Sequence, residues 1–463
     1  MDNDVEPALS TGPLLLIAAA SVAVLLFLIM RVRLHAFLSL IVVSLLTALA
    51  TRIPLPDVVP TMVDGIGGTL GDVALLVALG AILGRLLEIS GGAQVLADVL
   101  VGRTQGNRAA LAIGVAALLF GFPIFFDAGL VVFLPILFTV ARRMGGSLLT
   151  YGLPVAGAFA VMHAFVPPHP GPVAAAGLID AEVGLVLVFG LAIGVPTWFF
   201  GSYLFGLYVG RRVHVAVPQV LASQEEVDRE TEERPPPRFL SVLGILLLPL
   251  LLIFGETGLG TLEEQGTVDG DNTLVQAVRM VGQTPVALLI AVLVAIVVCG
   301  FAQRRSAEDV EKITDGAFGP VASIILITGA GGMFGAVLQA SGIGQALAET
   351  LEDTGMPVIV AAFVVAAALR VSQGSATVAL ITASSLMAPV IGAGDYSEAY
   401  KALTVIAIAG GSTVLSHVND SGFWLVGRFF EMDVRTTLKT WTVMVTLLGG
   451  IAALLAFAAS TFV

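Results

Sequence analysis

Apolar stretches of membrane-spanning length recur along this chain from one end to the other, and this pattern constrains the fold more than any other feature. A helix needs about 20 mostly apolar residues to cross a bilayer, and backbone groups in lipid must be hydrogen-bonded internally. Hydrophobic residues make up 57% of the chain and charged residues only 12%. We therefore predict an all-α polytopic membrane protein. The first apolar stretch, 14–30, follows acidic rather than basic residues, which indicates a retained span instead of a signal peptide.

Arginine and lysine clusters orient the spans, because short cytoplasmic loops are enriched in these residues. Placing every basic loop inside leaves both termini and the acidic loop Gly255–Asn272 outside, and the polar linker Ser223–Arg238 inside. Spans 108–123 and 124–140 are short, so we expect them to be tilted or discontinuous. The pattern predicts about fourteen spans: 12–30, 34–51, 66–88, 108–123, 124–140, 150–166, 183–209, 239–254, 285–303, 317–339, 357–371, 374–391, 402–418 and 440–461.

The two halves of the chain contain a repeated sequence. Residues 62–100 align without a gap to residues 313–351, and 13 of the 39 aligned positions are identical. Apolar composition alone explains matches of Gly and Leu, but it does not explain matches such as Asp64 with Asp315 or Ser90 with Ser341. We interpret 1–210 and 239–463 as two repeated halves, joined by the cytoplasmic polar linker 211–238.

The two copies are expected to cross the membrane in opposite directions. Asp315 follows the basic loop 304–312 and is placed inside, whereas Asp64 follows a span that leaves the basic loop 31–33 and is placed outside. Inverted-topology repeats are typical of secondary transporters. The segments just after Ser90 and Ser341 are too short to cross and return, so we predict re-entrant hairpins or interfacial helices there, with plain loops as the alternative.

Four polar or proline-rich breaks interrupt the apolar stretches. Non-helical backbone at membrane depth occurs where it lines a protein cavity, and interruptions in corresponding positions of two halves indicate a transport site. At the offset of the repeat, His169 coincides with Asp420, and Asp127 falls within one residue of Thr377. The breaks are Phe120–Gly129, His163–Pro172, Arg370–Ala379 and Gly410–Trp424.

The breaks supply groups that suit a small polyhydroxylated anion. Helix N-termini expose unpaired N–H groups and the positive end of the helix dipole, which bind carboxylates. Arg370 is either a substrate counter-ion or a snorkelling cytoplasmic anchor. For the histidines, hydrogen-bonded packing is the alternative to a functional role. We predict a substrate site formed by His163, His169, Ser372, Gln373, Ser375, Thr377, His417, Asn419 and Ser421.

Asp127 and Asp420 are the candidates for proton coupling. Ionisable residues within spans are costly in their charged form and are usually functional. Asp127 lies between apolar residues, as suits a carboxyl group that takes up and releases a proton; a helix cap or a structural partner for an arginine is the alternative. Asp420 is predicted to carry a proton or to coordinate a cation.

The residues at these breaks are similar to a known family. The segments YGLPVAGAFAVMHAFVPPHPGP (Tyr151–Pro172), QGSATVA (Gln373–Ala379) and SHVNDSGFW (Ser416–Trp424) resemble the gluconate:proton symporter, or gluconate permease, family of the ion transporter superfamily. The resemblance covers essentially the whole chain in length and order. It implies an inner-membrane permease that imports gluconate or a related sugar acid with protons. The acidic loop and the acidic, lysine-poor surface depart from the family in composition and leave substrate and coupling ion open.

The leading prediction is a proton-coupled sugar-acid symporter in the cytoplasmic membrane. A sodium-coupled carboxylate symporter is the alternative, because Ser375, Asn419 and Asp420 can also hold Na⁺. An intramembrane enzyme is disfavoured, because the sequence contains no GxSxG motif and no metal-ligand constellation. We therefore predict no metal and no cofactor, and the absence of a basic patch excludes nucleic acid. The predicted partners are a sugar-acid anion, protons and the lipid bilayer; the oligomeric state, a homodimer included, stays open.

Overall fold

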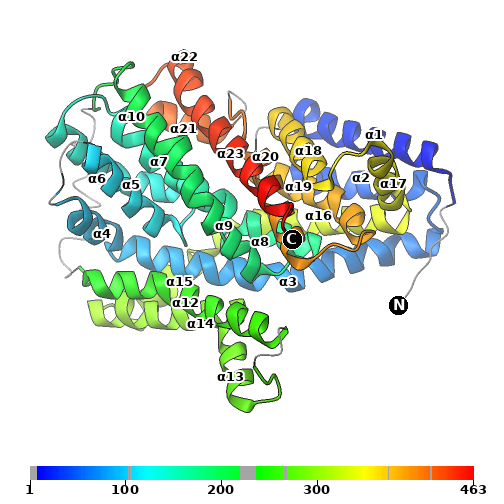
Figure 1. Ribbon diagram of the computed structural model, residues 1–463, viewed down its shortest axis with the longest axis horizontal. Helices are drawn as coiled ribbons and strands as arrows, with labels where there is room; N and C mark the ends of the chain where they lie inside the picture. The colour runs from blue at the N-terminus through cyan, green and yellow to red at the C-terminus, as the bar shows by residue number, and fades with distance from the viewer. Residues whose placement is uncertain are drawn as a thin grey trace.

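The regular structure of this protein is helical throughout the residues that the computed structural model describes, which are 8–102, 104, 107–218, 236–264, 268–373, 375–417 and 420–463 (Figure 1). The prediction of an all-α polytopic membrane protein is confirmed, whereas the number of spans stays a prediction. Within those ranges, the helical stretches long and apolar enough to cross a membrane are Leu55–Ile89, Leu149–Ile179, Val183–Gly210, Phe239–Gly260, Thr284–Gln303, Val321–Ala340 and Val434–Ser460.

The elements of the first half run from α1 to α10. They are α1 (Thr11–Phe27), η1 (Leu28–Val32), α2 (Ala36–Ala50), α3 (Leu55–Ile89), α4 (Gly92–Val101), α5 (Asn107–Gly121), α6 (Phe126–Met144), α7 (Leu149–Phe165), α8 (Pro170–Ile179), α9 (Val183–Trp198), η2 (Phe199–Leu204) and α10 (Phe205–Gly210).

The elements of the second half run from α12 to α23. They are α12 (Phe239–Glu264), α13 (Thr273–Gly282), α14 (Thr284–Ala295), η3 (Ile296–Gly300), η4 (Phe301–Gln303), α15 (Ala307–Asp315), α16 (Phe318–Ala340), α17 (Ile343–Thr354), α18 (Val358–Gln373), α19 (Ala376–Gly392), α20 (Glu398–Thr413), α21 (Ser421–Phe429), α22 (Val434–Thr437), η5 (Leu438–Thr442) and α23 (Val443–Ser460).

The repeated sequences adopt the same local conformation. Helices α3 and α16 each end at a serine whose hydroxyl donates a 2.9 Å hydrogen bond to the carbonyl three residues earlier, from Ser90 to Leu87 and from Ser341 to Leu338. The next residues, Gly91 and Gly342, have φ angles of 78° and 77°. Glycine adopts this left-handed backbone without the penalty that a side chain brings. The turn separates each long helix from a short one, α4 or α17, so these segments are helices and not plain loops. Their re-entrant or interfacial placement stays a prediction.

Helices α3 and α16 also pack against each other in antiparallel directions. Gly65 of α3 lies against Ala336, while Leu70, five residues further along α3, lies against Gly329, seven residues earlier in α16. A Cβ atom on Gly65 would lie 2.6 Å from the Cβ atom of Ala336. Small residues at such contacts let helix backbones approach closely. In Figure 1, α3 runs along most of the long axis of the molecule, and other helices lie on both sides of it.

The predicted breaks divide four segments into helix pairs. Helices α5 and α6 are separated by residues 122–125, and α18 and α19 by residues 374–375; we call these pairs hairpin 1 and hairpin 2. Helices α7 and α8 are separated by residues 166–169, and α20 and α21 by residues 414–420. The short predicted spans 108–123 and 124–140 are thus the two arms of hairpin 1. Each half contributes one hairpin and one interrupted helix.

One sequence expectation differs from the structure. The predicted acidic loop Gly255–Asn272 begins inside a helix, because α12 continues to Glu264. Arg279 of α13 lies beside this extension, and its guanidinium forms ion pairs with Glu256, at 3.4 Å, and with Glu263. These contacts hold two acidic side chains of the last turns of α12 against α13. The sequence showed the acidic residues, but it did not show that Arg279 of α13 would pair with two of them.

Candidate functional site

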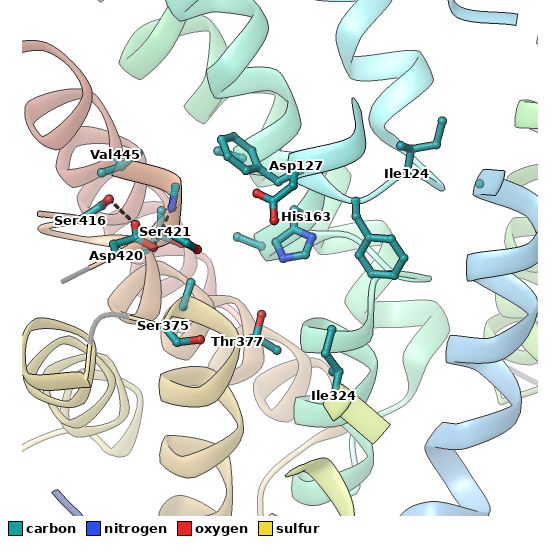
Figure 2. A pocket seen from close by; sticks show the side chains of 18 of the residues that line it. Ile124, Asp127, His163, Ile324, Ser375, Thr377, Ser416, Asp420, Ser421 and Val445 are labelled. Carbon is teal, nitrogen blue, oxygen red and sulfur yellow. Dashed lines mark hydrogen bonds between the residues drawn. The ribbon is translucent and has the colours of Figure 1, made fainter. Parts of the chain in front are cut away.

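A cavity of about 550 Å³ lies where the two hairpins and the two interrupted helices meet (Figure 2). Figure 2 shows Asp127 and His163 on one side of this cavity, Ser416, Asp420 and Ser421 on another, and Ser375 and Thr377 below them. Both halves of the chain therefore contribute to one site. Six of the residues predicted from the sequence line it: Asp127, His163, Ser375, Thr377, Asp420 and Ser421.

Two predicted histidines take other positions. His169 is 3% exposed and lies behind the cavity wall, where its Nε2 atom is 2.8 Å from the carbonyl oxygen of Gly121. Its ring centroid is 5.1 Å from that of His163, so it packs behind a lining residue. His417 is half-buried, and its Nε2 atom lies 3.1 Å from the carbonyl oxygen of Val371. Neither side chain lines the cavity.

Three further predicted residues belong to the same breaks. Ser372 and Gln373 form the last two residues of α18, next to the tip of hairpin 2, but their side chains lie outside the part of the structure that is described. Asn419 also lies outside the described residues. These three assignments stay predictions.

Hairpin 1 brings Asp127 to the cavity. Its tip contains Pro123, which has no backbone N–H and so cannot continue the α5 hydrogen-bond ladder. Helix α6 then begins at Phe126, which leaves Asp127 in the first helical turn. Gly84 of α3 seats the tip: a Cβ atom there would collide with the carbonyl group of Pro123. One turn earlier in α3, Gly80 lies against Pro168 of the interrupted helix in the same half.

Hairpin 2 brings Ser375 and Thr377 to the opposite part of the cavity. Ser375 is the N-cap of α19, and its hydroxyl accepts a 3.3 Å hydrogen bond from the backbone N–H of Val378. Thr377 follows in the first turn. The N-terminus of α19 thus faces the cavity with its unpaired N–H groups and the positive end of its dipole.

The interrupted helix of the second half positions Asp420. This residue is the N-cap of α21, and its Oδ1 atom accepts a 3.1 Å hydrogen bond from the N–H of Gly422. Its Oδ2 atom lies 2.5 Å from Nη2 of Arg370 and also accepts a hydrogen bond from the Ser416 hydroxyl. That hydroxyl in turn accepts a 2.8 Å hydrogen bond from Nε1 of Trp441. Asp420 is therefore held by Arg370 of α18 and by two groups close to it in sequence, and Trp441 supports one of these, Ser416.

His163 presents an unused polar atom at the site. It lies near the end of α7 and lines the cavity beside Phe125, whose ring centroid is 6.1 Å away. Its Nδ1 atom is buried and has no hydrogen-bond partner among the residues the structure describes. Buried polar atoms are nearly always satisfied, so the unpartnered Nδ1 atom makes His163 a lining side chain with unused hydrogen-bonding capacity.

The sequence did not reveal several lining residues. Arg370 had two interpretations, and the structure disagrees with the snorkelling anchor: the side chain is 3% exposed and paired with Asp420. Its role as a substrate counter-ion stays a prediction. Ser416 lies in a predicted break but was not selected, and Trp441 lies outside the breaks, because their importance comes from contacts: Ser416 with Asp420, and Trp441 with Ser416. Arg85 and Glu88 of α3 form a 3.0 Å ion pair that also lines the cavity. Their charges within an apolar span were an available signal.

Comparison with known proteins places this architecture among membrane transporters. The Alcanivorax borkumensis YdaH transporter superposes with a TM-score of 0.63 over 89% of this chain and 90% of its own, at 18% sequence identity. Neisseria gonorrhoeae MtrF, described as one of a class of antimetabolite efflux pumps, superposes with a TM-score of 0.65 over 93% of this chain and 96% of its own, at 14% identity. At these identities the likeness concerns the fold alone.

Sequence relatives are more similar. The inner membrane permease YgbN of Escherichia coli K12 is 38% identical over 95% of this chain and 97% of its own length. The low-affinity gluconate transporter of the same organism is 39% identical over 96% and 98%. The gluconate permease of Bacillus licheniformis is 37% identical over 94% and 96%.

The family comparison agrees with these relatives. The family described as GntP family permease matches residues 13–462, nearly the whole chain. Its members are transporters, not enzymes, and the inner-membrane relatives and the apolar helices together identify a multi-pass protein of the cell membrane. This chain belongs to the GntP permease family.

Proposed function

We propose that this protein imports gluconate or a related sugar acid by proton symport. The observation that carries the proposal is the convergence of three helix N-termini, those of α6, α19 and α21, on one cavity. Helix N-termini bind anions through unpaired N–H groups and the helix dipole. Arg370, in its ion pair with Asp420, lies at the same place. The names of the relatives, which include gluconate transporters, support the same class of substrate.

The polar lining suits a substrate with several hydroxyl groups. Hydroxyl-bearing side chains lie among apolar ones in the cavity lining, together with the His163 ring. Hydroxyls can both donate and accept, so they match a chain of substrate hydroxyls without a fixed polarity. The hydroxyl-bearing side chains are Ser375, Thr377, Thr413, Ser416 and Ser421.

The halves 1–210 and 239–463 are proposed to act as inverted repeats around this site, with 211–238 as the cytoplasmic linker. The antiparallel packing of α3 and α16 supports this, as do the matched turns at Gly91 and Gly342. In such transporters one repeat moves against the other around a fixed central site, which opens to each side in turn.

Asp127 is the proposed proton carrier. It stands in the first turn of α6 at the cavity wall, while the other predicted carboxylate, Asp420, is occupied by Arg370 and Ser416. A carboxyl group that is not held by a cation can change its protonation when an anion binds nearby. Sodium is the competing coupling ion.

Counterflow of labelled gluconate into proteoliposomes tests the proposal. Vesicles loaded with unlabelled gluconate should take up the labelled compound, and other sugar acids should compete. A pH gradient, acidic outside, should drive accumulation without sodium. Accumulation that requires a sodium gradient at equal pH would favour the sodium-coupled alternative, and absence of counterflow would refute a gluconate carrier.

A further inference from the structure

A second cavity, which we call the apolar cavity, lies between α1 and the two arms of hairpin 2 and has a volume of about 490 Å³. The described residues that line it are all Ala, Val, Leu or Met, so their side chains offer no strong hydrogen bond to water or to a polar solute. Apolar cavities exclude water but bind apolar molecules of suitable size. The chemistry of the lining therefore selects a hydrocarbon.

Helix α2 holds α1 beside this cavity. Ser21 Oγ of α1 lies 2.7 Å from Thr47 Oγ1 of α2, and both side chains are buried. Hydrogen bonds between hydroxyl-bearing side chains fix how two helices pack within a membrane. Leu14 and Leu25 are buried on the same face of α1 as Ser21. The neighbouring stripe of α1 faces the apolar cavity instead, through Leu15, Ala18, Ala19, Val22 and Leu26.

This stripe has the length of a lipid chain in one leaflet. Leu26 follows Leu15 by 11 residues, which is about 16 Å along a helix that rises about 1.5 Å per residue. The hydrocarbon core of a bilayer is about 30 Å thick, so the chains of one leaflet extend about 15 Å. Helix α1 is itself an apolar helix of a multi-pass membrane protein. The apolar cavity thus matches one lipid chain in length and in chemistry.

Charges around the apolar cavity select the headgroup of that lipid. Arg31 and Arg33 follow the Leu26 end of the stripe, in and just after η1, and both are exposed. Element η1 also contacts α18, so these arginines lie beside an arm of hairpin 2. Helix α17 lines the cavity through Leu347, and its charged residues are all acidic: Glu349, Glu352 and Asp353. A phosphate group is attracted to the arginines and repelled by α17.

We propose that the apolar cavity binds one hydrocarbon chain of an anionic phospholipid, whose phosphate lies beside Arg31 and Arg33. The predicted topology places this basic end on the cytoplasmic side, where anionic lipids attract clusters of Arg and Lys. The lipid therefore comes from the cytoplasmic leaflet.

Hairpin 2 separates this lipid site from the 550 Å³ cavity around Asp127. Leu369 of α18 lines the apolar cavity, whereas the next residue, Arg370, lines the other one. Thr377 and Met387 divide α19 between the two cavities in the same way. A bound lipid chain packs against the back of hairpin 2 and supplies contacts that hold its position. We expect transport to depend on this lipid.

Retention of lipid by the purified protein is the first measurement. Detergent-washed protein is incubated with equal amounts of phosphatidylglycerol and phosphatidylcholine and purified again, and the lipid extracted from it is quantified by mass spectrometry. Wild-type protein should retain about tenfold more phosphatidylglycerol than phosphatidylcholine. Equal retention of the two lipids, or retention of neither, overturns the proposal.

Two adjacent alanines provide a matched pair of variants. Ala19→Phe places a ring in the apolar cavity and should abolish most of the retained phosphatidylglycerol. Ala20→Phe makes the same change at the next residue of α1, which is exposed and lies outside the lining, and should retain lipid as the wild type does. Equal retention by the two variants would show that lipid binds elsewhere.

The headgroup is tested without a change in the apolar lining. The double variant Arg31→Gln, Arg33→Gln should retain the two lipids about equally, because the phosphate of either lipid remains but the attraction for net negative charge is lost. Arg52→Gln, at another exposed arginine, should keep the preference of the wild type. An unchanged preference in the double variant refutes the assignment of the headgroup. This comparison also decides if Ala19→Phe does not fold.

Gluconate counterflow measures the effect on transport. Wild-type protein should exchange gluconate about tenfold faster in vesicles that contain phosphatidylglycerol than in vesicles of phosphatidylcholine alone, and the arginine double variant should lose this difference. Rates that do not depend on the lipid contradict the support of hairpin 2. Lipid retention as expected, without counterflow in either vesicle, would refute the proposed function and leave the lipid site standing.

Discussion

Arg370 and Asp420 form a buried ion pair that joins the tip of hairpin 2 to the break before α21, across 50 residues of sequence. Both side chains are almost fully enclosed, at 3% and 11% exposure. Charges removed from water are tolerated when they are paired and further hydrogen-bonded, and Asp420 also accepts from Ser416 and from the N–H of Gly422. The pair therefore fixes how two elements of the same half face the cavity.

The first prediction concerns this pair. Asp420→Asn should lower the unfolding free energy by about 3–5 kcal/mol, because it leaves the Arg370 guanidinium buried without its counter-charge. The double variant Arg370→Met, Asp420→Asn should recover part of that loss. Thermal unfolding of the purified protein in detergent measures both. Equal destabilisation by the single and double variants would show that the charge pair is not what holds the break.

The second prediction concerns the seat of hairpin 1. Gly84→Ala should slow gluconate counterflow by about 100-fold, because the new methyl group displaces the Pro123 carbonyl and moves Asp127 away from its position. Gly67→Ala, on the same helix with nothing within 4 Å of the added carbon, is the control and should transport normally. Equal rates in the two variants would argue against α3 as the support of the tip.

A third prediction separates two histidines. His163→Gln should raise the KM for gluconate about tenfold, because it removes a hydrogen-bonding nitrogen at the cavity wall. His417→Gln should change KM little, since His417 lies outside the lining. Initial uptake rates over a range of gluconate concentrations measure this difference. A larger effect of His417→Gln than of His163→Gln would place the substrate nearer to His417, in the break between α20 and α21.

A fourth prediction separates capping from binding. Ser375 and Ser397 are both helix N-caps, accepting from Val378 at 3.3 Å and from Tyr400 at 3.1 Å. Either serine changed to alanine should cost about 1 kcal/mol of stability. Only Ser375→Ala should also weaken gluconate binding, because Ser397 caps α20 away from the cavity. Thermal unfolding measures the loss of stability, and the KM for uptake measures the loss of affinity. If both variants lose affinity equally, Ser375 acts only as a helix cap and does not bind the substrate.

The fifth prediction concerns orientation. In a Cys299→Ala background, Asp271→Cys should react with an impermeant maleimide added to intact cells, and Glu308→Cys should react only after the cells are opened. Both positions are exposed, whereas Cys299 is 1% exposed. Labelling of Glu308→Cys from outside would reverse the topology.

Much of this protein was determined by its sequence alone. Because a bilayer leaves backbone groups no partner except each other, the apolar stretches were sufficient to predict an all-helical membrane protein. The same rule made each polar break informative. The residues it selected include Asp127, His163, Ser375, Thr377, Asp420 and Ser421, which line the cavity, although they also include His169 and His417, which do not. These residues could be selected because each is a polar side chain within or beside an apolar stretch, which the neighbouring sequence shows directly.

Contacts between distant segments were decided only by the tertiary structure. Whether Arg370 extends towards solvent or turns inwards depends on Asp420 lying opposite it, and the hydroxyl of Ser416 matters because Trp441 reaches it from η5. His169 and His417 lie in breaks as His163 does, yet backbone carbonyls hold them outside the cavity lining. A break in a helix shows that a polar environment must exist nearby. The packing of the two halves decides which side chains face that environment. One face of a helix lines the cavity only when other elements cover its remaining faces.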